Sequence, residues 1–288
     1  MRRSFALLVV LALAGCGEAP LLPSEFDTRT ASDSGSEAIG LFDAASATTA
    51  SGGDDGVWAQ ATDWSTCVSI GDLKVELRTY KLLRVQVQTV GEFWREKRTI
   101  CSIANTPLLG QTTVFPEKLV AALAPMTVDA ALTAAGAYQS SFEAQLIGVK
   151  MESPLSDPMP LDANDPRVID TDGDGKPGGT LLVGTLCEVY QANRARSMLK
   201  GTRGAAGRIE GGAVHSVSQV FLGGTSAFCT QPWPTLDNHA HHRFAMVKAL
   251  PAGLDADGNG DVSCAEIIAG QAKVMAWQPA DDKRCTTP

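Results

Sequence analysis

The amino-acid sequence predicts a mainly β fold, built as an antiparallel sandwich or as a barrel-like domain. The clearest pattern has a period of two: between residues 73 and 87 the odd positions are mostly Leu and Val, whereas Glu, Arg and Gln lie opposite. Such alternation is typical of a strand, or a pair of strands, with one buried face. The 28 Gly and 15 Pro in the 288-residue chain also indicate many turns.

Further strands are expected where apolar residues gather in short runs between Gly-rich turns. These runs are residues 142–151, 180–191, 214–222 and 244–250. A helix is expected at residues 116–123, where Pro116 occupies the first turn and Glu117 follows it. Together these elements define a β-rich domain at residues 57–250, followed by a short C-terminal segment at residues 251–288.

The N-terminus has the organisation of a secretory signal. Two arginines precede an apolar run at residues 5–13, which is too short to span a bilayer and ends in small residues directly before Cys16. The tetrapeptide Leu-Ala-Gly-Cys at this point resembles the lipobox of bacterial lipoproteins. The resemblance implies that the signal at residues 1–15 is removed and that Cys16 is acylated, which anchors the chain in a membrane. Gly17, in place of an inner-membrane retention Asp, favours the outer membrane.

The composition of the segment after the signal predicts a disordered tether. Residues 16–56 consist mainly of Ser, Thr, Ala, Gly and acidic residues, with Arg29 as their single basic residue. Such a segment has too little apolar surface to offset the entropy lost on ordering. The whole chain has a formal charge of -8, which argues against a nucleic-acid partner.

The cysteine count indicates disulfides. Of the seven cysteines, Cys16 belongs to the lipobox, which leaves six in the exported part. An even number in an oxidising compartment predicts up to three disulfides, although the sequence does not select among the 15 possible pairings. Pairing of neighbours (67 with 101, 187 with 229, 264 with 285) is preferred because it closes short loops. The candidates are Cys67, Cys101, Cys187, Cys229, Cys264 and Cys285.

The strongest motif lies at residues 255–266. Oxygen-bearing side chains occupy positions 1, 3, 5, 7, 9 and 12 of this segment, and Gly260 stands at position 6. The pattern resembles the EF-hand calcium loop, and calcium takes six to eight oxygen ligands. A proline and a glycine before the loop break the incoming helix, so we expect a solitary loop followed by a helix at residues 264–277. The alternative is an Asp/Gly turn without metal. The predicted ligands are Asp255, Asp257, Asn259, Asp261 through its carbonyl group, Ser263 and Glu266.

A second Asp-rich loop, at residues 170–181, matches the first half of the same pattern. Its position 12 is Leu181, so the two oxygens that a glutamate would supply are missing, and the loop resembles the truncated calcium loops of extracellular modules. Asp162 or Asp165 could complete the ligand shell. A plain acidic turn is the alternative. The predicted ligands are Asp170, Asp172, Asp174 and Lys176.

Other candidate chemistry is weaker. His239, His241 and His242 lie close together in the sequence, and the first two could share a strand face and chelate a transition metal with Asp237, although an exposed strand edge is the commoner reading. The nucleophile, zinc-protease, P-loop and dinucleotide motifs are missing from the sequence, and we therefore expect no enzyme.

These observations favour a cell-envelope lipoprotein, with a β-rich domain that calcium and disulfides stabilise, in a structural or interaction role. Its expected cofactor is calcium, and its expected contact is the membrane that holds the lipid anchor, with the domain facing the periplasm or the cell surface. The alternative function is a lipocalin-like carrier of an apolar ligand, which would need an internal pocket of several hundred Å³ lined by Leu, Val and Phe.

Overall fold

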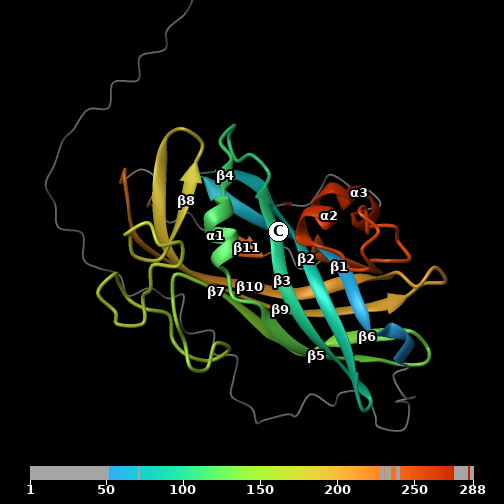
Figure 1. Ribbon diagram of the computed structural model, residues 1–288. Coiled ribbons are helices and arrows are strands. Elements are labelled where there is room, and N and C mark those ends of the chain that lie inside the picture. Colours follow the sequence, from blue (N-terminus) through green and yellow to red (C-terminus); the bar gives the residue numbers. More distant parts are fainter. Residues whose placement is uncertain are drawn as a thin grey trace, which may run out of the picture. The chain divides into compact units, whose positions relative to one another are not determined.

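Twelve antiparallel strands form one hydrogen-bonded sheet in the computed structural model (Figure 1). The structure describes residues 52–70, 72–227, 230, 235–237, 241–275 and 285. All of them belong to one of the two units into which the chain divides, Phe42–Pro288. The prediction of a mainly β, antiparallel fold with a short helical C-terminal segment is confirmed.

The strands differ greatly in length, and three hairpins of long strands provide most of the sheet. The strands are β1 (Gly56–Ile70), β2 (Leu73–Val90), β3 (Phe93–Asn105), β4 (Thr113–Val114), β5 (Met126–Leu132), β6 (Ala137–Ser140), β7 (Glu143–Ile147), β8 (Gly179–Val183), β9 (Cys187–Arg203), β10 (Ile209–Gly224), β11 (Thr235–Asp237) and β12 (Arg243–Lys248). The helices are a 3₁₀ turn η2 (Gly52–Asp54), α1 (Glu117–Ala122), α2 (Cys264–Ala269) and α3 (Gln271–Val274).

The sheet closes on itself. Its hydrogen-bonded order runs β10, β12, β1, β2, β3, β5, β6 and β9, and β9 pairs back with β10. Further along β3 and β9, the short strands β4 and β8 bridge these two strands, while β7 pairs with β9 and β11 with β1. The ring corresponds to the barrel-like form of the prediction.

The predicted elements appear, but several differ in their bounds, and the strand expected at residues 142–151 is β7 over residues 143–147 only. Residues 73–90 form the single strand β2, and the helix expected at residues 116–123 is α1, with Pro116 at its N-cap and not in its first turn. Residues 180–191, predicted as one strand, contain the turn between β8 and β9, where Gly184 adopts a φ of 53°. The helix predicted at residues 264–277 is divided into α2 and α3 at Gly270.

Alternate residues of the long strands fill the inside of the ring. Trp58 and Trp94 are buried with their ring centroids 5.4 Å apart, and Tyr138 and Phe244 pack beside them. Gly201 faces Gly211 across β9 and β10, and a Cβ atom on Gly201 would lie 2.9 Å from the Phe244 ring. This close approach explains why glycine stands where the sheet curves around a large aromatic side chain.

A second apolar cluster lies on the outer face of the sheet, beneath the C-terminal segment. Val262, Ile267 and Val274 are each 0% exposed, and they pack against Ala59 and Ala61 of β1. Figure 1 shows α2 and α3 lying over β1 and β2. The C-terminal segment is therefore held on the sheet by buried apolar surface.

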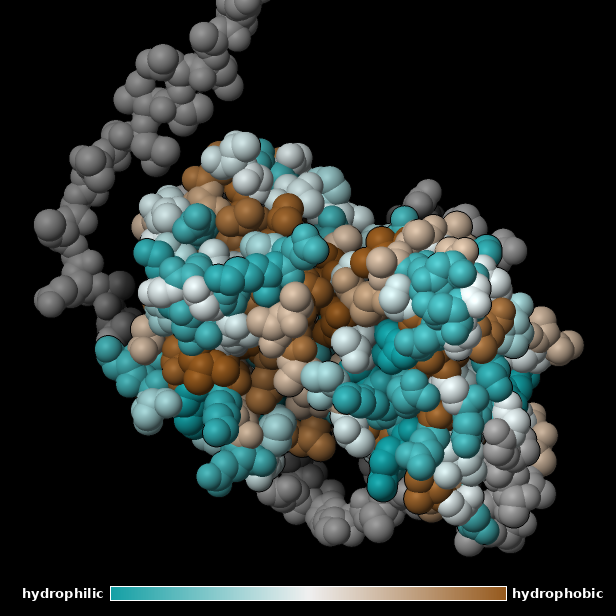
Figure 2. Space-filling view, viewed as in Figure 1, coloured by the Kyte–Doolittle hydropathy of each residue, from teal (hydrophilic) through white to brown (hydrophobic). Residues whose placement is uncertain are grey.

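The surface seen from the same side is mixed. Figure 2 shows hydrophilic residues over most of this face, with hydrophobic residues gathered between α1 and the C-terminal helices. Within the described residues, the helices are all too short or too polar to cross a lipid bilayer.

Candidate metal centres

The loop at residues 255–266 brings three of its predicted ligands together. Carboxylate oxygens of Asp255, Asp257 and Glu266 lie within 4.8 Å of one another. The Asp255 carboxylate accepts hydrogen bonds from the backbone N–H groups of Gly258 (2.8 Å) and Gly260 (3.0 Å). Both glycines have positive φ, 73° and 85°, which only glycine adopts without strain, and this produces the sharp turn.

Glu266 has hydrogen-bond partners at both carboxylate oxygens. Oε2 accepts from the N–H (2.8 Å) and hydroxyl (2.9 Å) of Ser263, and Oε1 accepts from the N–H of Ala256 (2.8 Å). These bonds, first that of the Ser263 backbone, lower the pKa of Glu266 to about 2. Ser263 is the N-cap of α2, and the two residues form a capping box. The spacing Ser-x-x-Glu could have predicted this second role from the sequence.

The remaining predicted ligands of this loop point to other partners. The Asp261 carboxylate lies 2.7 Å from a guanidinium nitrogen of Arg84, whose hydrogen bond lowers the pKa of Asp261. The Asp261 carboxylate is therefore paired with Arg84, which leaves the carbonyl group that the sequence analysis assigned as the ligand. Asn259 donates its amide to Asp257 over 2.8 Å, and its own oxygen accepts from the N–H of Asp261.

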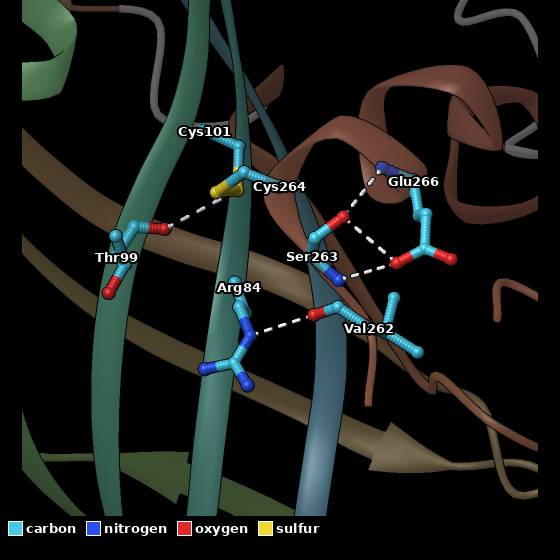
Figure 3. The surroundings of a disulfide bond; sticks show 7 residues. All are labelled: Arg84, Thr99, Cys101, Val262, Ser263, Cys264 and Glu266. Carbon is cyan, nitrogen blue, oxygen red and sulfur yellow. Dashed lines mark hydrogen bonds between the residues drawn. A yellow bond between two sulfur atoms is a disulfide. The ribbon is translucent and has the colours of Figure 1, made fainter. Parts of the chain in front are cut away.

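Besides the Arg84–Asp261 ion pair, a hydrogen bond and a disulfide attach this loop to the sheet (Figure 3). Arg84 of β2 donates from Nε to the carbonyl oxygen of Val262 over 2.7 Å, and Cys264 forms a disulfide with Cys101 of β3. Figure 3 shows the disulfide between β3 and the first turn of α2, with the carboxylate of Glu266 turned toward Ser263. These contacts fix the C-terminal end of the loop, next to Glu266, on the sheet.

The observed disulfides contradict the predicted pairing of neighbours. Cys67 pairs with Cys285 across 218 residues, and Cys101 pairs with Cys264 across 163 residues. The predicted pairs 67 with 101 and 264 with 285 were wrong, because folding, and not loop length, brings thiols together. The predicted pair 187 with 229 stays a prediction. Cys187 is also disulfide-bonded. Cys229 and the lipobox Cys16 lie outside the described residues.

The loop at residues 170–180 also gathers its predicted carboxylates. Oxygens of Asp170, Asp172 and Asp174 lie within 4.8 Å of one another. Asp170 accepts from the N–H of Gly175 (2.8 Å), and Asp174 accepts from the hydroxyl of Thr180 (2.6 Å). The chain then enters β8 directly, so the loop has a strand at its exit instead of a helix.

Asp172 differs from the other two aspartates because it is buried. It is 6% exposed, and its Oδ2 accepts from the N–H of Thr180 over 3.1 Å, whereas its Oδ1 has no hydrogen-bond partner among the described residues. Burial raises the pKa of Asp172, and the neighbouring charge of Asp174 adds to the effect. A buried carboxylate oxygen without a partner fits a cation ligand, because a cation would compensate its charge.

Other residues predicted around this loop lie elsewhere. Asp165 is not in the cluster: it pairs with Arg167 over 2.7 Å, and this hydrogen bond lowers the pKa of Asp165 to about 2. Asp162 accepts from the N–H of Asn164 and is also absent from the cluster. Lys176 donates its N–H to Asp174, and its ammonium lies 5.6 Å from the centre of the Tyr190 ring.

Two of the three described histidines, His215 and His242, lie against Trp64, a contact that the sequence did not predict. His215 stacks on Trp64 at 4.5 Å, and His242 contacts the edge of the same ring at 5.6 Å. His242 is 1% exposed, and its Nδ1 accepts from the N–H of Ser65. The expectation of an exposed strand edge was therefore wrong for His242, and His239 lies outside the described residues.

Comparison with known proteins found no match: no family model, no curated protein and no solved structure is similar to this chain.

A buried charged network inside the ring was also missed. Arg98 and Glu96, both 0% exposed, form an ion pair at 2.6 Å, and Glu96 accepts from the Tyr138 hydroxyl at 3.0 Å. A second arginine nitrogen lies 2.9 Å from Glu143 of β7. The only local signal was that Glu96 and Arg98 share a strand face with Trp94, which places them inside.

Proposed function

We propose that the protein is an exported lipoprotein of the cell envelope, anchored through Cys16, whose β-rich domain binds calcium and serves a structural or interaction role. The observation that carries the proposal is the convergence of Asp carboxylates in two separate loops, one of them with a buried oxygen at Asp172 that has no hydrogen-bond partner among the described residues. The disulfides support it, because such bonds persist in oxidising compartments.

Calcium acts in this proposal through linkage. An ion that binds the folded chain and not the unfolded one stabilises the fold by about 2.7 kcal/mol for each site when calcium is at 100 times its dissociation constant. The C-terminal loop is exposed at Asp257 and only half-buried at Asp255 and Glu266, and it lacks a paired EF-hand within the described residues. Affinities typical of extracellular modules, about 0.1 to 1 mM, are therefore expected.

The test is thermal unfolding of the protein with EDTA and with calcium at about 10 mM. For a domain of this size, calcium should raise the melting temperature by about 5 to 10 °C relative to EDTA, and magnesium should raise it less. Equal melting temperatures in EDTA and calcium would remove the support for a calcium role. The anchor is tested in the same preparations, because Cys16→Ser should shift the protein from the membrane fraction to the soluble fraction.

The second candidate, a carrier of an apolar ligand, is less well supported. Large side chains occupy the inside of the ring, among them Trp58, Trp94, Tyr138 and Phe244, each 1% exposed or less. This packing favours an interaction role over a carrier. A fluorescent fatty acid that bound with micromolar affinity and was displaced by natural lipids would reverse the order of the two candidates.

A further inference from the structure

A small cavity with both polar and apolar walls lies between β1, β2, β3, β5, β7 and β9. The space open to the centres of water-sized molecules is about 20 Å³. A site of this size accommodates one or two molecules as small as water, or a guest with only a few non-hydrogen atoms. The polar side chains on its wall are Gln60, Thr62, Trp64, Lys81, Glu143, Gln145 and Ser197, and the rest of the wall is apolar (Leu83, Ile100, Met126 and Ala195).

The wall presents several polar atoms that have no hydrogen-bond partner among the described residues. Gln60, Thr62 and Trp64 on β1 are 1%, 2% and 4% exposed, and their Oε1, Oγ1 and Nε1 atoms are unpartnered. On β7, Glu143 Oε2 and Gln145 Oε1 also have no hydrogen-bond partner among the described residues. Unpaired buried polar groups are unfavourable, so the wall is suited to a small guest that both donates and accepts hydrogen bonds.

Lys81 supplies a nucleophile to this cavity. It pairs with Thr62 across β1 and β2, and its side chain forms no ion pair in the part of the chain that the structure describes. Burial lowers the pKa of Lys81 to about 8, and the negative charge of Glu143 opposes this effect. A lysine amine with a pKa near 8 is partly neutral at physiological pH, and the neutral fraction can attack a carbonyl carbon.

The other charged groups near the cavity largely compensate one another. Glu143 contacts Arg98 at 2.9 Å and accepts a hydrogen bond from Ser197 at 2.9 Å. Arg98 is also paired with Glu96, which accepts from Tyr138. Lys81 is therefore the cationic group on the cavity wall that has no ion-pair contact of its own within the described residues.

We propose that Lys81 is a covalent binding site for small aldehydes, which enter this cavity and form an imine with the ε-amine. The neutral nitrogen attacks the carbonyl carbon, an N–C bond forms, and the carbonyl oxygen becomes a hydroxyl group as a proton passes from nitrogen to oxygen through solvent. Loss of that hydroxyl group with the second N–H proton, as water, gives the C=N bond. The Trp64 N–H can hold the carbonyl oxygen, and the Gln oxygens can accept from a hydroxyl substituent of the aldehyde.

The test is reductive trapping on the whole protein. Glycolaldehyde and cyanoborohydride convert an imine to a stable secondary amine, and peptide mass spectrometry compares Lys81 with the exposed Lys97 and Lys200 in the same sample. An amine with a pKa of about 8 is about one-tenth neutral at pH 7, against about 0.03% at 10.5, so Lys81 should be modified at least about tenfold faster than either control. Its rate should rise to half of its maximum near pH 8.

Three results would overturn the proposal. The first is modification of Lys81 at the rate of Lys97 or below. The second is an equal preference for Lys81 with benzaldehyde, which the cavity is too small to admit. The third is the absence of an effect of Glu143→Gln. This substitution removes the charge that favours the ammonium and should increase trapping at pH 7, whereas the exposed control Glu152→Gln should not. A folded Glu143→Gln protein with unchanged trapping contradicts the mechanism, and the wild-type measurements decide the case if that variant does not fold.

Discussion

In the loop at residues 255–266 the carboxylate of Glu266 accepts hydrogen bonds at both oxygens, whereas in the loop at residues 170–180 one oxygen of the buried Asp172 has no partner among the described residues. The first loop is the more complete calcium motif, yet its backbone and serine groups already compensate the charge of Glu266. The second loop lacks the glutamate at position 12, yet it contains a buried carboxylate, that of Asp172, with an oxygen whose charge no described hydrogen-bond donor compensates. Completeness of a motif and electrostatic demand for a metal are therefore separate properties.

The largest expected effect on stability comes from removal of the disulfide that links the 255–266 loop to β3. The double substitution Cys101→Ser with Cys264→Ser should lower the free energy of unfolding by about 2 to 5 kcal/mol, because the unfolded chain is no longer crosslinked across 163 residues. Urea denaturation measures this global loss. Hydrogen exchange at residues 254–274 should also increase, because this segment loses its covalent link to β3. Calcium binding by the 170–180 loop should be unchanged. If the exchange of residues 254–274 did not increase, the apolar contacts beneath α2 would be sufficient to hold the loop.

The next effect separates the two loops by substitution of one carboxylate in each. In EDTA, Asp172→Asn should leave the melting temperature unchanged or raise it by up to about 2 to 4 °C, because it removes a buried charge and keeps the acceptor for Thr180. Glu266→Gln should lower it, because charge-assisted bonds to Ser263 and Ala256 are weakened.

Each variant should also lose part of the stabilisation by calcium that the wild type shows. Scanning calorimetry in EDTA and in calcium checks both expectations. As a matched control, Asp162→Asn changes a carboxylate outside both clusters and should preserve the whole response. A full calcium response in Asp172→Asn would remove the 170–180 loop from the proposal.

The smallest effect is a difference in pH dependence. Glu266 has a pKa of about 2 in the folded chain, below its ordinary value of 4.5, so its stabilising contribution is complete above pH 4.5 and is lost as the pH falls toward 2. Asp172 has a raised pKa, so its burial destabilises the fold at neutral pH and acidification relieves that cost. Between pH 6 and pH 3 in EDTA, Glu266→Gln should flatten the loss of stability and Asp172→Asn should steepen it. Identical profiles for both variants would contradict this opposition.

The features that the sequence predicted well are local ones. The alternation at residues 73–87 correctly predicted β2, because the side chains of a strand alternate between its two faces whichever strand it pairs with. The Asp-rich segments likewise predicted that their carboxylates converge, because glycines within each loop make the turns that bring these carboxylates together. In both cases the interactions that fix the structure lie within a few residues of one another.

The features that the sequence did not predict depend on distant pairing. The bond between Cys67 and Cys285 requires β1 and the last residues of the chain to meet, and no local pattern encodes that contact. The position of His242 against Trp64 and the burial of Arg98 beside Glu143 likewise follow from closure of the ring. A sequence pattern can place a side chain on one face of a strand, but it does not say which other strand supplies its partner.

The two long-range disulfides have a consequence for proteolysis. The largely exposed segment at residues 161–170, which includes Leu161 at 91% exposure, lies between Cys101 and Cys264 in the chain. A single cut there produces an N-terminal piece with Cys67 and Cys101 and a C-terminal piece with Cys264 and Cys285. Both disulfides join one piece to the other, so a protease that nicks this surface releases neither fragment. The cleaved protein would migrate as one molecule until it is reduced.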